Sequence, residues 1–144
     1  MKKQSLWIRA FLPLVVLFLA VLWSATLIQA EGQASPLDGM TFVGEYGKQG
    51  HQAEAKDEFS FKNGAFRSSA CDPYGFGDGA YSANVKGETT IFQAETVSKN
   101  EGKIKWSGAV KGDSLDGIFI WYQEGKAPVE YWIKGKLRKE IEKS

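Results

Sequence analysis

Short runs of β-branched and aromatic residues recur along the chain from residue 41 to residue 137, and turns rich in Gly, Asn and Asp separate them. The runs recur about every 8 to 12 residues, which is the spacing of strands in an all-β sandwich or barrel. No window after Ala30 shows the sustained period of an amphipathic helix. We therefore predict eight strands, near residues 41–47, 57–62, 65–70, 80–86, 89–97, 103–111, 114–123 and 127–137.

Turn chemistry predicts how these strands pair, because directly opposed residues of an antiparallel hairpin share one face of the sheet. The Asn63-Gly64 turn is the strongest hairpin signal in the chain. It sets Phe61 opposite Phe66 and Phe59 opposite Ser68, so one face of this hairpin is apolar. The opposite face then carries Glu58, Ser60, Lys62 and Arg67.

The three later hairpins lead to the same separation of faces. The turns at 87–88 and 112–113 oppose seven inward pairs: Val85 and Thr90, Ala83 and Phe92, Tyr81 and Ala94, Val110 and Leu115, Gly108 and Gly117, Trp106 and Phe119, Ile104 and Trp121. An odd-length loop at 124–126 places Val129, Tyr131, Ile133 and Leu137 inside, and it sets Asp116 opposite Lys134 outside. Agreement of four independent turns is typical of a sequence that specifies one fold.

Consecutive short connections predict an all-β, antiparallel, eight-stranded up-and-down barrel spanning residues 40–138. Closure requires residues 129–137 to pair with residues 41–47. If those two strands do not meet, the alternative is a β-sandwich. Residues 31–39 form a lead-in segment and residues 139–144 a charged tail.

The first thirty residues have the layout of a signal peptide, with Lys2, Lys3 and Arg9 before an uncharged apolar run over 10–23. We expect cleavage after Ala30, or alternatively after Ala34, and export to the periplasm or the medium. An uncleaved membrane anchor is the alternative, because the apolar character extends to Ile28.

Charge argues against nucleic acid or a membrane surface as a partner of the mature chain. Residues 1–30 carry three of the 18 Lys and Arg and none of the 17 Asp and Glu, so the remainder has a net charge of −2. The remaining positive and negative charges are interspersed, and no basic block is present.

Nine large aromatic side chains are predicted on the inner face: Phe59, Phe61, Phe66, Tyr81, Phe92, Trp106, Phe119, Trp121 and Tyr131. They either line a ligand pocket or fill the barrel. Because each buries roughly 150 to 250 Å², we favour a mostly filled barrel with a shallow pocket at the rim.

The connection from Cys71 to Gly79 is the longest irregular segment in this interpretation and would lie at a barrel rim. Tyr74 and Phe76 could cap an opening there. Alternatively, the segment is a tight glycine-rich turn whose aromatic side chains fold back and plug the barrel end. The residues predicted to bind a ligand are Tyr74, Phe76, Trp106, Phe119, Trp121 and Tyr131.

An apolar cluster is predicted on the outer face, where the register sets Ile118 opposite Trp132 with Ile120 and Tyr122 nearby. Exposed patches of this kind often mark association surfaces, so we predict a self-association or partner interface here. The alternative is that residues 48–56 or the C-terminal tail cover the patch.

Catalytic and metal-binding patterns are not found in the sequence. The one histidine, His51, and the one cysteine, Cys71, have no ligand spacing with Asp72 or Asp78 that would indicate a metal, and we expect no metal and no cofactor. Cys71 is expected to be an inert, partly buried thiol rather than a redox group, a metal ligand or an intermolecular disulfide partner.

The paired carboxylates available for acid–base chemistry, Asp57 with Glu58 and Asp113 with Asp116, are expected to be solvated. We therefore expect no enzymatic activity.

The predicted architecture resembles that of the lipocalin-like, or calycin, barrels. Residues 37–44 (LDGMTFVG) are similar to the Gly-x-Trp opening of lipocalins, with Phe42 where tryptophan is usual and a spacing that differs by one. Trp106-Ser107-Gly108, followed by a hairpin and Trp121, resembles the avidin-type barrel. The resemblance implies a binder of small molecules.

The sequence thus predicts an exported binding protein for a small apolar or aromatic ligand, or for a protein partner. The alternative is a structural or inhibitory interaction protein of the cell envelope.

Overall fold

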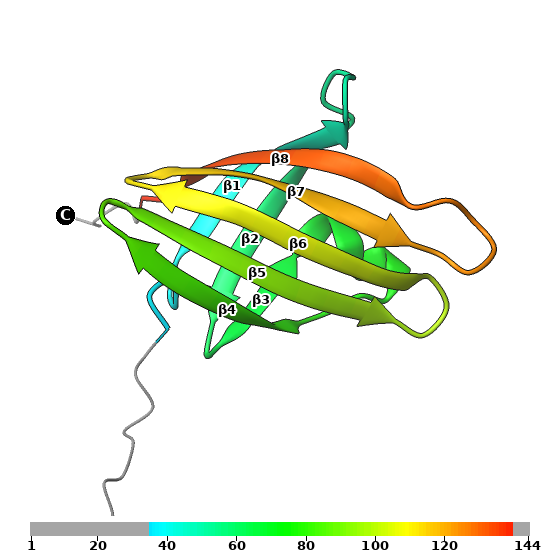
Figure 1. The fold of residues 1–144 in the computed structure, drawn as a ribbon, viewed down its shortest axis with the longest axis horizontal. Coiled ribbons are helices and arrows are strands. Elements are labelled where there is room, and N and C mark those ends of the chain that lie inside the picture. The colour runs from blue at the N-terminus through cyan, green and yellow to red at the C-terminus, as the bar shows by residue number, and fades with distance from the viewer. Residues whose placement is uncertain (1–34, 140–144) are drawn as a thin grey trace, which may run out of the picture. The chain divides into compact units, whose positions relative to one another are not determined.

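The computed structural model describes residues 35–139 and shows an antiparallel barrel closed by eight strands in chain order (Figure 1). The strands are β1 (Thr41–Lys48), β2 (Ala55–Lys62), β3 (Ala65–Ser68), β4 (Gly79–Lys86), β5 (Thr89–Ser98), β6 (Gly102–Lys111), β7 (Ser114–Tyr122) and β8 (Val129–Leu137). A 3₁₀ helix, η2 (Ser69–Tyr74), follows β3. The predicted signal peptide at 1–30 lies outside the described residues, as do 31–34 and 140–144.

The predicted closure and register are both confirmed. β8 pairs with β1, with Gly44 opposite Gly135, so the barrel rather than the sandwich is correct. Phe61 lies opposite Phe66, and each of the other opposed pairs that the turns predicted is present. The first hairpin turns as expected because Asn63 and Gly64 both have positive φ angles, 52° and 74°, as a type I′ turn requires.

The barrel is filled with aromatic side chains over most of its length. Phe59, Phe61, Phe66 and Phe92 are essentially inaccessible to solvent, and their rings contact one another and Trp106 at centroid distances between 4.9 and 6.4 Å. Aromatic pairs at these separations add to the hydrophobic stabilisation. The interior is therefore a packed core through its middle.

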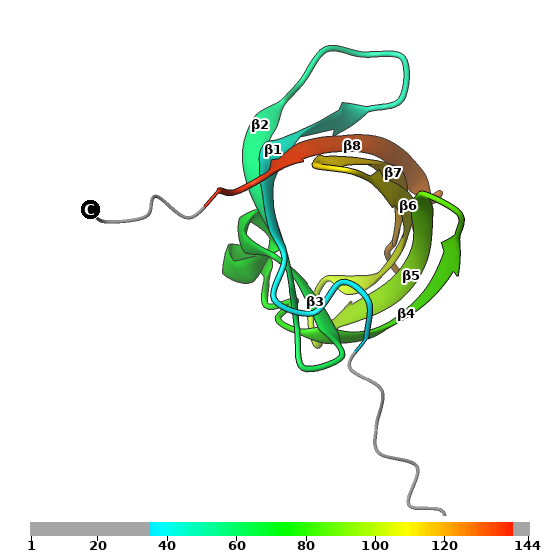
Figure 2. The same ribbon diagram turned by 90° about the vertical axis from the view of Figure 1, so that its left-hand side faces the viewer.

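The described part of the lead-in segment, residues 35–39, runs across one end of the barrel (Figure 2). Leu37 is buried in the core. Beside it, an Asp38 carboxylate oxygen accepts hydrogen bonds from the Tyr81 hydroxyl at 2.7 Å and from the Gly64 backbone N–H at 3.0 Å. Leu37 and these hydrogen bonds therefore attach the segment to this end of the core.

The predicted third strand is wrong at its C-terminal end, where residues 69 and 70 belong to η2 instead. The Ala70 N–H donates to the Asp57 carboxylate at 2.9 Å and so does not join the sheet ladder. The Ser69 hydroxyl lies 3.2 Å from the same carboxylate oxygen. Pro73 follows within the helix, and it has no N–H to offer a neighbouring strand.

Val85 is the one predicted inward residue that is largely exposed, with 55% of its surface accessible. β3 pairs with β4 only at Ala65 opposite Ala80 and Phe66 opposite Gly79. The later part of β4 therefore has β5 as its only sheet neighbour and extends past the core (Figure 1).

Candidate binding cavity

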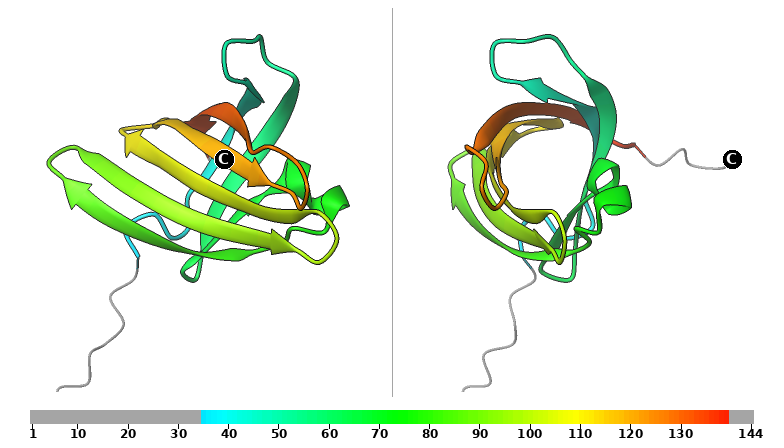
Figure 3. Two further views of the ribbon diagram at one scale, coloured as in Figure 1. Left: turned by 45° about the vertical axis from the view of Figure 1, so that its right-hand side comes forward. Right: turned by 90° about the vertical axis from the view of Figure 1, so that its right-hand side faces the viewer.

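A cavity of about 150 Å³ lies at the barrel end opposite the lead-in segment. Its lining comes from the ends of β1 and β7, from the starts of β2, β6 and β8, and from η2 with the residues around it. Figure 3 shows how these elements are arranged. The lining residues are Tyr46, Glu54, Asp57, Ala70, Cys71, Tyr74, Phe76, Ile104, Phe119, Trp121 and Tyr131. At about 30 Å³ per water molecule, this volume corresponds to about five waters.

Aromatic side chains form two groups around the cavity. In the first, Phe119 stacks on Tyr131 at a centroid distance of 4.5 Å, and Tyr46 lies 5.9 Å from Phe119 and 6.1 Å from Tyr131. In the second, Tyr74 and Phe76 each contact the Trp121 ring, at 6.0 and 6.1 Å. The Trp121 indole N–H donates to the Glu101 carbonyl oxygen at 2.7 Å, which fixes the orientation of this ring.

Five of the six predicted ligand-binding residues therefore line one cavity. Trp106 is the exception. It is buried in the core, and its indole N–H donates to the Thr96 hydroxyl at 2.9 Å. Trp106 borders instead an outer depression of about 580 Å³ along β4–β7, which is lined mainly by outward side chains such as Ser82, Gln93 and Lys105.

The two aromatic residues of the irregular connection behave differently from each other. Phe76 is buried, as in the prediction of a plugging turn. Tyr74 is 52% exposed and lies at the cavity, as in the prediction of a cap over an opening. The alternative of a plugging turn thus describes Phe76, and the alternative of a cap over an opening describes Tyr74.

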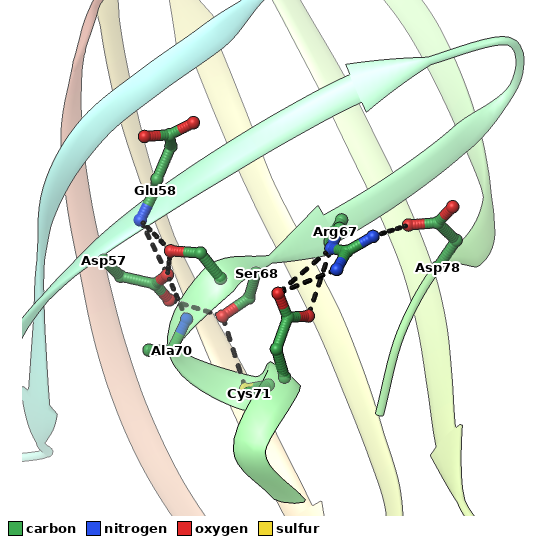
Figure 4. Close-up of polar contacts among 9 residues, drawn as sticks. Asp57, Glu58, Arg67, Ser68, Ala70, Cys71 and Asp78 are labelled. Carbon is green, nitrogen blue, oxygen red and sulfur yellow. Dashed lines mark hydrogen bonds and ion pairs between the residues drawn. The ribbon is translucent and has the colours of Figure 1, made fainter. Parts of the chain in front are cut away.

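Asp57 was predicted to be a solvated carboxylate, and this is wrong, because only 5% of its surface is accessible. One carboxylate oxygen accepts from the backbone N–H groups of Glu58 at 2.6 Å and Ala70 at 2.9 Å, and the Ser69 hydroxyl is 3.2 Å away. The other oxygen accepts from the Ser68 hydroxyl at 2.5 Å (Figure 4). Burial raises the pKa of Asp57, and these hydrogen bonds oppose that rise.

Cys71 is a free, partly buried thiol beside this carboxylate. Its sulfur lies 3.3 Å from the Ser68 hydroxyl oxygen. A hydroxyl has one proton, and Ser68 uses it in the shorter bond to Asp57, so the thiol is the donor in this second contact. Burial raises the pKa of Cys71 to about 11, which keeps it protonated and a poor nucleophile at neutral pH.

An ion-pair network on the outer side of the wall holds η2 against β3. The Arg67 guanidinium donates to the Asp72 carboxylate at 2.8 Å and lies 3.5 Å from that of Asp78 (Figure 4). At the far end of η2, the Ser98 hydroxyl donates to the Tyr74 carbonyl oxygen at 2.7 Å. Both ends of the helix that carries the cavity wall are therefore anchored.

The outer residues predicted to bind a partner are partly buried. Ile118 lies opposite Trp132 as predicted, and Ile120 and Tyr122 lie on the same face. The Trp132 indole N–H donates to the His51 carbonyl oxygen at 3.0 Å, and its ring lies against Gly47. The β1–β2 connection thus covers part of this patch, and the interface itself stays a prediction.

Six of the lining residues were not among the predicted site residues, and three of these six carry oxygen in their side chains: Tyr46, Glu54 and Asp57. Strand parity could have found two of them, because Tyr46 alternates with the buried Phe42 and Asp57 alternates with the inward Phe59. Glu54 lies in the β1–β2 connection, where its N–H donates to the Tyr46 carbonyl oxygen at 2.8 Å. Because Glu54 lies outside the strands, strand alternation makes no prediction for the direction of its side chain.

Other classes of site were sought within residues 35–139. No group of three or more His, Cys, Asp or Glu side chains there is arranged to hold a metal ion. No helix in the same range is long and apolar enough to cross a bilayer.

Comparison of the chain with models of known protein families, with curated proteins and with solved structures finds no match. The closed eight-stranded antiparallel barrel is consistent with a lipocalin-like architecture, and membership of that family stays a prediction.

Proposed function

We propose that this protein is an exported, non-enzymatic binding protein and that its ligand is a small molecule held in the cavity at the open end of the barrel. The observation that carries the proposal is the convergence of six aromatic side chains on one cavity: Tyr46, Tyr74, Phe76, Phe119, Trp121 and Tyr131. Cavities lined by aromatic groups with a few buried polar groups are typical of ligand sites.

The volume of the cavity limits the size of the ligand. The core beneath it is packed with phenylalanine rings and Trp106, so a ligand cannot pass deeper into the barrel without displacing them. About 150 Å³ suits a compact molecule with a single ring or a short branched chain, and it excludes the long acyl chains that a hollow barrel could hold.

Packing around the cavity also supports a preformed site. The Trp121 ring and the η2 helix are both fixed by hydrogen bonds that do not involve a ligand. A wall that is ordered before binding loses less conformational entropy when the ligand enters.

Native mass spectrometry of the protein purified from its own host tests the proposal. Wild-type protein is expected to carry a bound small molecule. Ala70→Leu, which fills the cavity from η2, is expected to carry none, whereas Ala80→Leu, at an exposed position on β4, should retain it. A bound molecule that survives Ala70→Leu would place the ligand elsewhere and contradict the proposal.

A further inference from the structure

Charge is distributed unevenly around the cavity. Two of its lining residues are carboxylic acids, Asp57 and Glu54, and none is a lysine, arginine or histidine. Glu54 is exposed, whereas Asp57 is buried at the start of β2. Arg67, on the outer side of the same wall, is engaged with Asp72 and Asp78. The cavity is therefore acidic, and no cationic side chain among its lining neutralises it.

The Asp57 carboxylate retains capacity for one more partner. One oxygen has three neighbouring donors, while the other has the Ser68 hydroxyl alone among the described residues. An ionised carboxylate oxygen can accept two hydrogen bonds. A buried carboxylate has lost most of its hydration, and this one has gained no counter-charge. A cation that approaches it therefore stabilises its ionised form.

The aromatic walls favour the same kind of ligand. The faces of tryptophan and tyrosine rings carry negative electrostatic potential, and they attract organic cations when several of them surround one space. Here Trp121, Tyr131 and Tyr46 contribute such rings together with Phe119. An uncharged apolar ligand would gain the ring contacts but would cover Asp57 without compensating its charge.

We propose that the ligand of this cavity is a small organic cation, an amine or a quaternary ammonium compound, whose positive nitrogen lies between the aromatic rings and the Asp57 carboxylate. This inference rests on the proposed binding function and adds the chemical class of the ligand. It concerns binding alone, since no bond is made or broken.

Matched pairs of probes separate the charge of the ligand from its shape. Choline is compared with 3,3-dimethyl-1-butanol, and isopentylamine with isopentanol, by isothermal titration calorimetry on the mature protein. In at least one pair the cation is expected to bind about tenfold or more tightly than its uncharged analogue. If the uncharged member binds as well as the cation, the cavity binds ligands and the charge inference is wrong. If none of the four binds, the charge inference is contradicted, and the native mass spectrometry of wild type and Ala70→Leu decides the binding proposal separately.

Substitution of the carboxylates assigns the effect to the cavity. Asp57→Asn keeps the size of the side chain and removes its charge, and it is expected to abolish the preference for the cation. Glu54→Gln, at the exposed mouth, is expected to weaken cation binding by a smaller factor and to fold normally, so it also serves if Asp57→Asn fails to fold. Glu45→Gln is the matched control, because it removes the same charge from the outer face of β1. An equal loss of binding in Glu45→Gln and Glu54→Gln would show that net charge, not the cavity, attracts the cation and would overturn the inference.

Discussion

The Ser68 hydroxyl oxygen lies 2.5 Å from a carboxylate oxygen of Asp57, inside the wall of the barrel and within reach of the Cys71 sulfur. Ser68 is the last residue of β3 and Asp57 the third residue of β2, so the bond joins two adjacent strands at the point where the chain leaves the sheet for η2. The same contact therefore holds β2 and β3 together and orients the Asp57 carboxylate at the cavity.

Ser68→Ala tests the structural importance of that contact. Among residues 35–139, Ser68 is the only side-chain donor to one oxygen of this buried carboxylate, and hydrogen bonds to charged groups contribute about 1.5 to 3 kcal/mol. We expect the free energy of unfolding to fall by about that amount in urea denaturation. Ser82→Ala, on the outer face of β4, is the control and should change the stability by less than about 0.5 kcal/mol. Equal losses in the two variants would contradict the role assigned to Ser68.

The raised pKa of Asp57 predicts how the stability of the protein depends on pH. Because burial raises the native pKa above the unfolded value, the native state binds the proton first as the pH falls. Stability from this group therefore increases as the pH falls through the native pKa and is lost as the pH rises through it.

The prediction is measured as the difference in unfolding free energy between wild type and Asp57→Asn, from about pH 3 to about pH 7. Wild type should gain stability relative to the variant towards the acidic end of this range. The other titratable groups around Asp57 are Glu54, Glu58, Cys71, Asp72 and the tyrosines at 46, 74 and 131, and they are common to both proteins. A difference that is flat, or that grows with rising pH, would contradict the burial of an uncompensated carboxylate.

Cys71 is expected to react slowly with alkylating reagents in the native protein. Its pKa is raised from 9.0 to about 11, and the thiolate is the reactive form. At about pH 8 this shift alone should make native alkylation about a hundredfold slower than alkylation in denaturant. Mass spectrometry after timed addition of iodoacetamide measures both rates. Similar rates in the two states would show that the thiol is solvated in the native protein.

The hydrogen bond from the Trp106 indole to Thr96 stabilises the filled part of the barrel. Both side chains are buried, and the bond is 2.9 Å long. Thr96→Val preserves the shape of the side chain and leaves the indole N–H unpaired, which should cost about 1 to 3 kcal/mol in the free energy of unfolding. In a Trp106→Phe background there is no indole N–H left unpaired, so the same change should cost clearly less. A cost that does not depend on residue 106 would contradict this account of the core.

Most of the fold could be predicted from the sequence because the inward and outward faces of hairpins are set by local turns. Asn63-Gly64 determines that Phe61 meets Phe66, and no distant contact is needed to establish it. The η2 helix could not be predicted in this way. It depends on hydrogen bonds from residues 69 and 70 to Asp57, which is more than ten positions earlier in the chain.

The candidate site was predicted in part for the same reason. The residues Phe119, Trp121 and Tyr131 follow from strand alternation, which places them on the inner face at one end of the barrel. The alternation places Asp57 on the inner face too, but Asp57 was expected to be solvated because it stands where the predicted strand meets a turn. The hydrogen-bond donors that make its burial possible come from Ser68 at the end of β3 and from Ser69 and Ala70 in η2. No pattern in the sequence indicates that these donors converge on Asp57.

The most direct test of the account is a titration of the mature protein with the cation that binds in calorimetry, followed by the indole N–H signals in two-dimensional NMR spectra. The barrel contains three indoles, in the cavity wall (Trp121), in the core beneath it (Trp106) and on the outer face (Trp132). The account predicts the largest shift at Trp121, a smaller one at Trp106 and none at Trp132, with smaller shifts in Asp57→Asn at the same cation concentration. Shifts centred on Trp132, or equal shifts in wild type and Asp57→Asn, would contradict it.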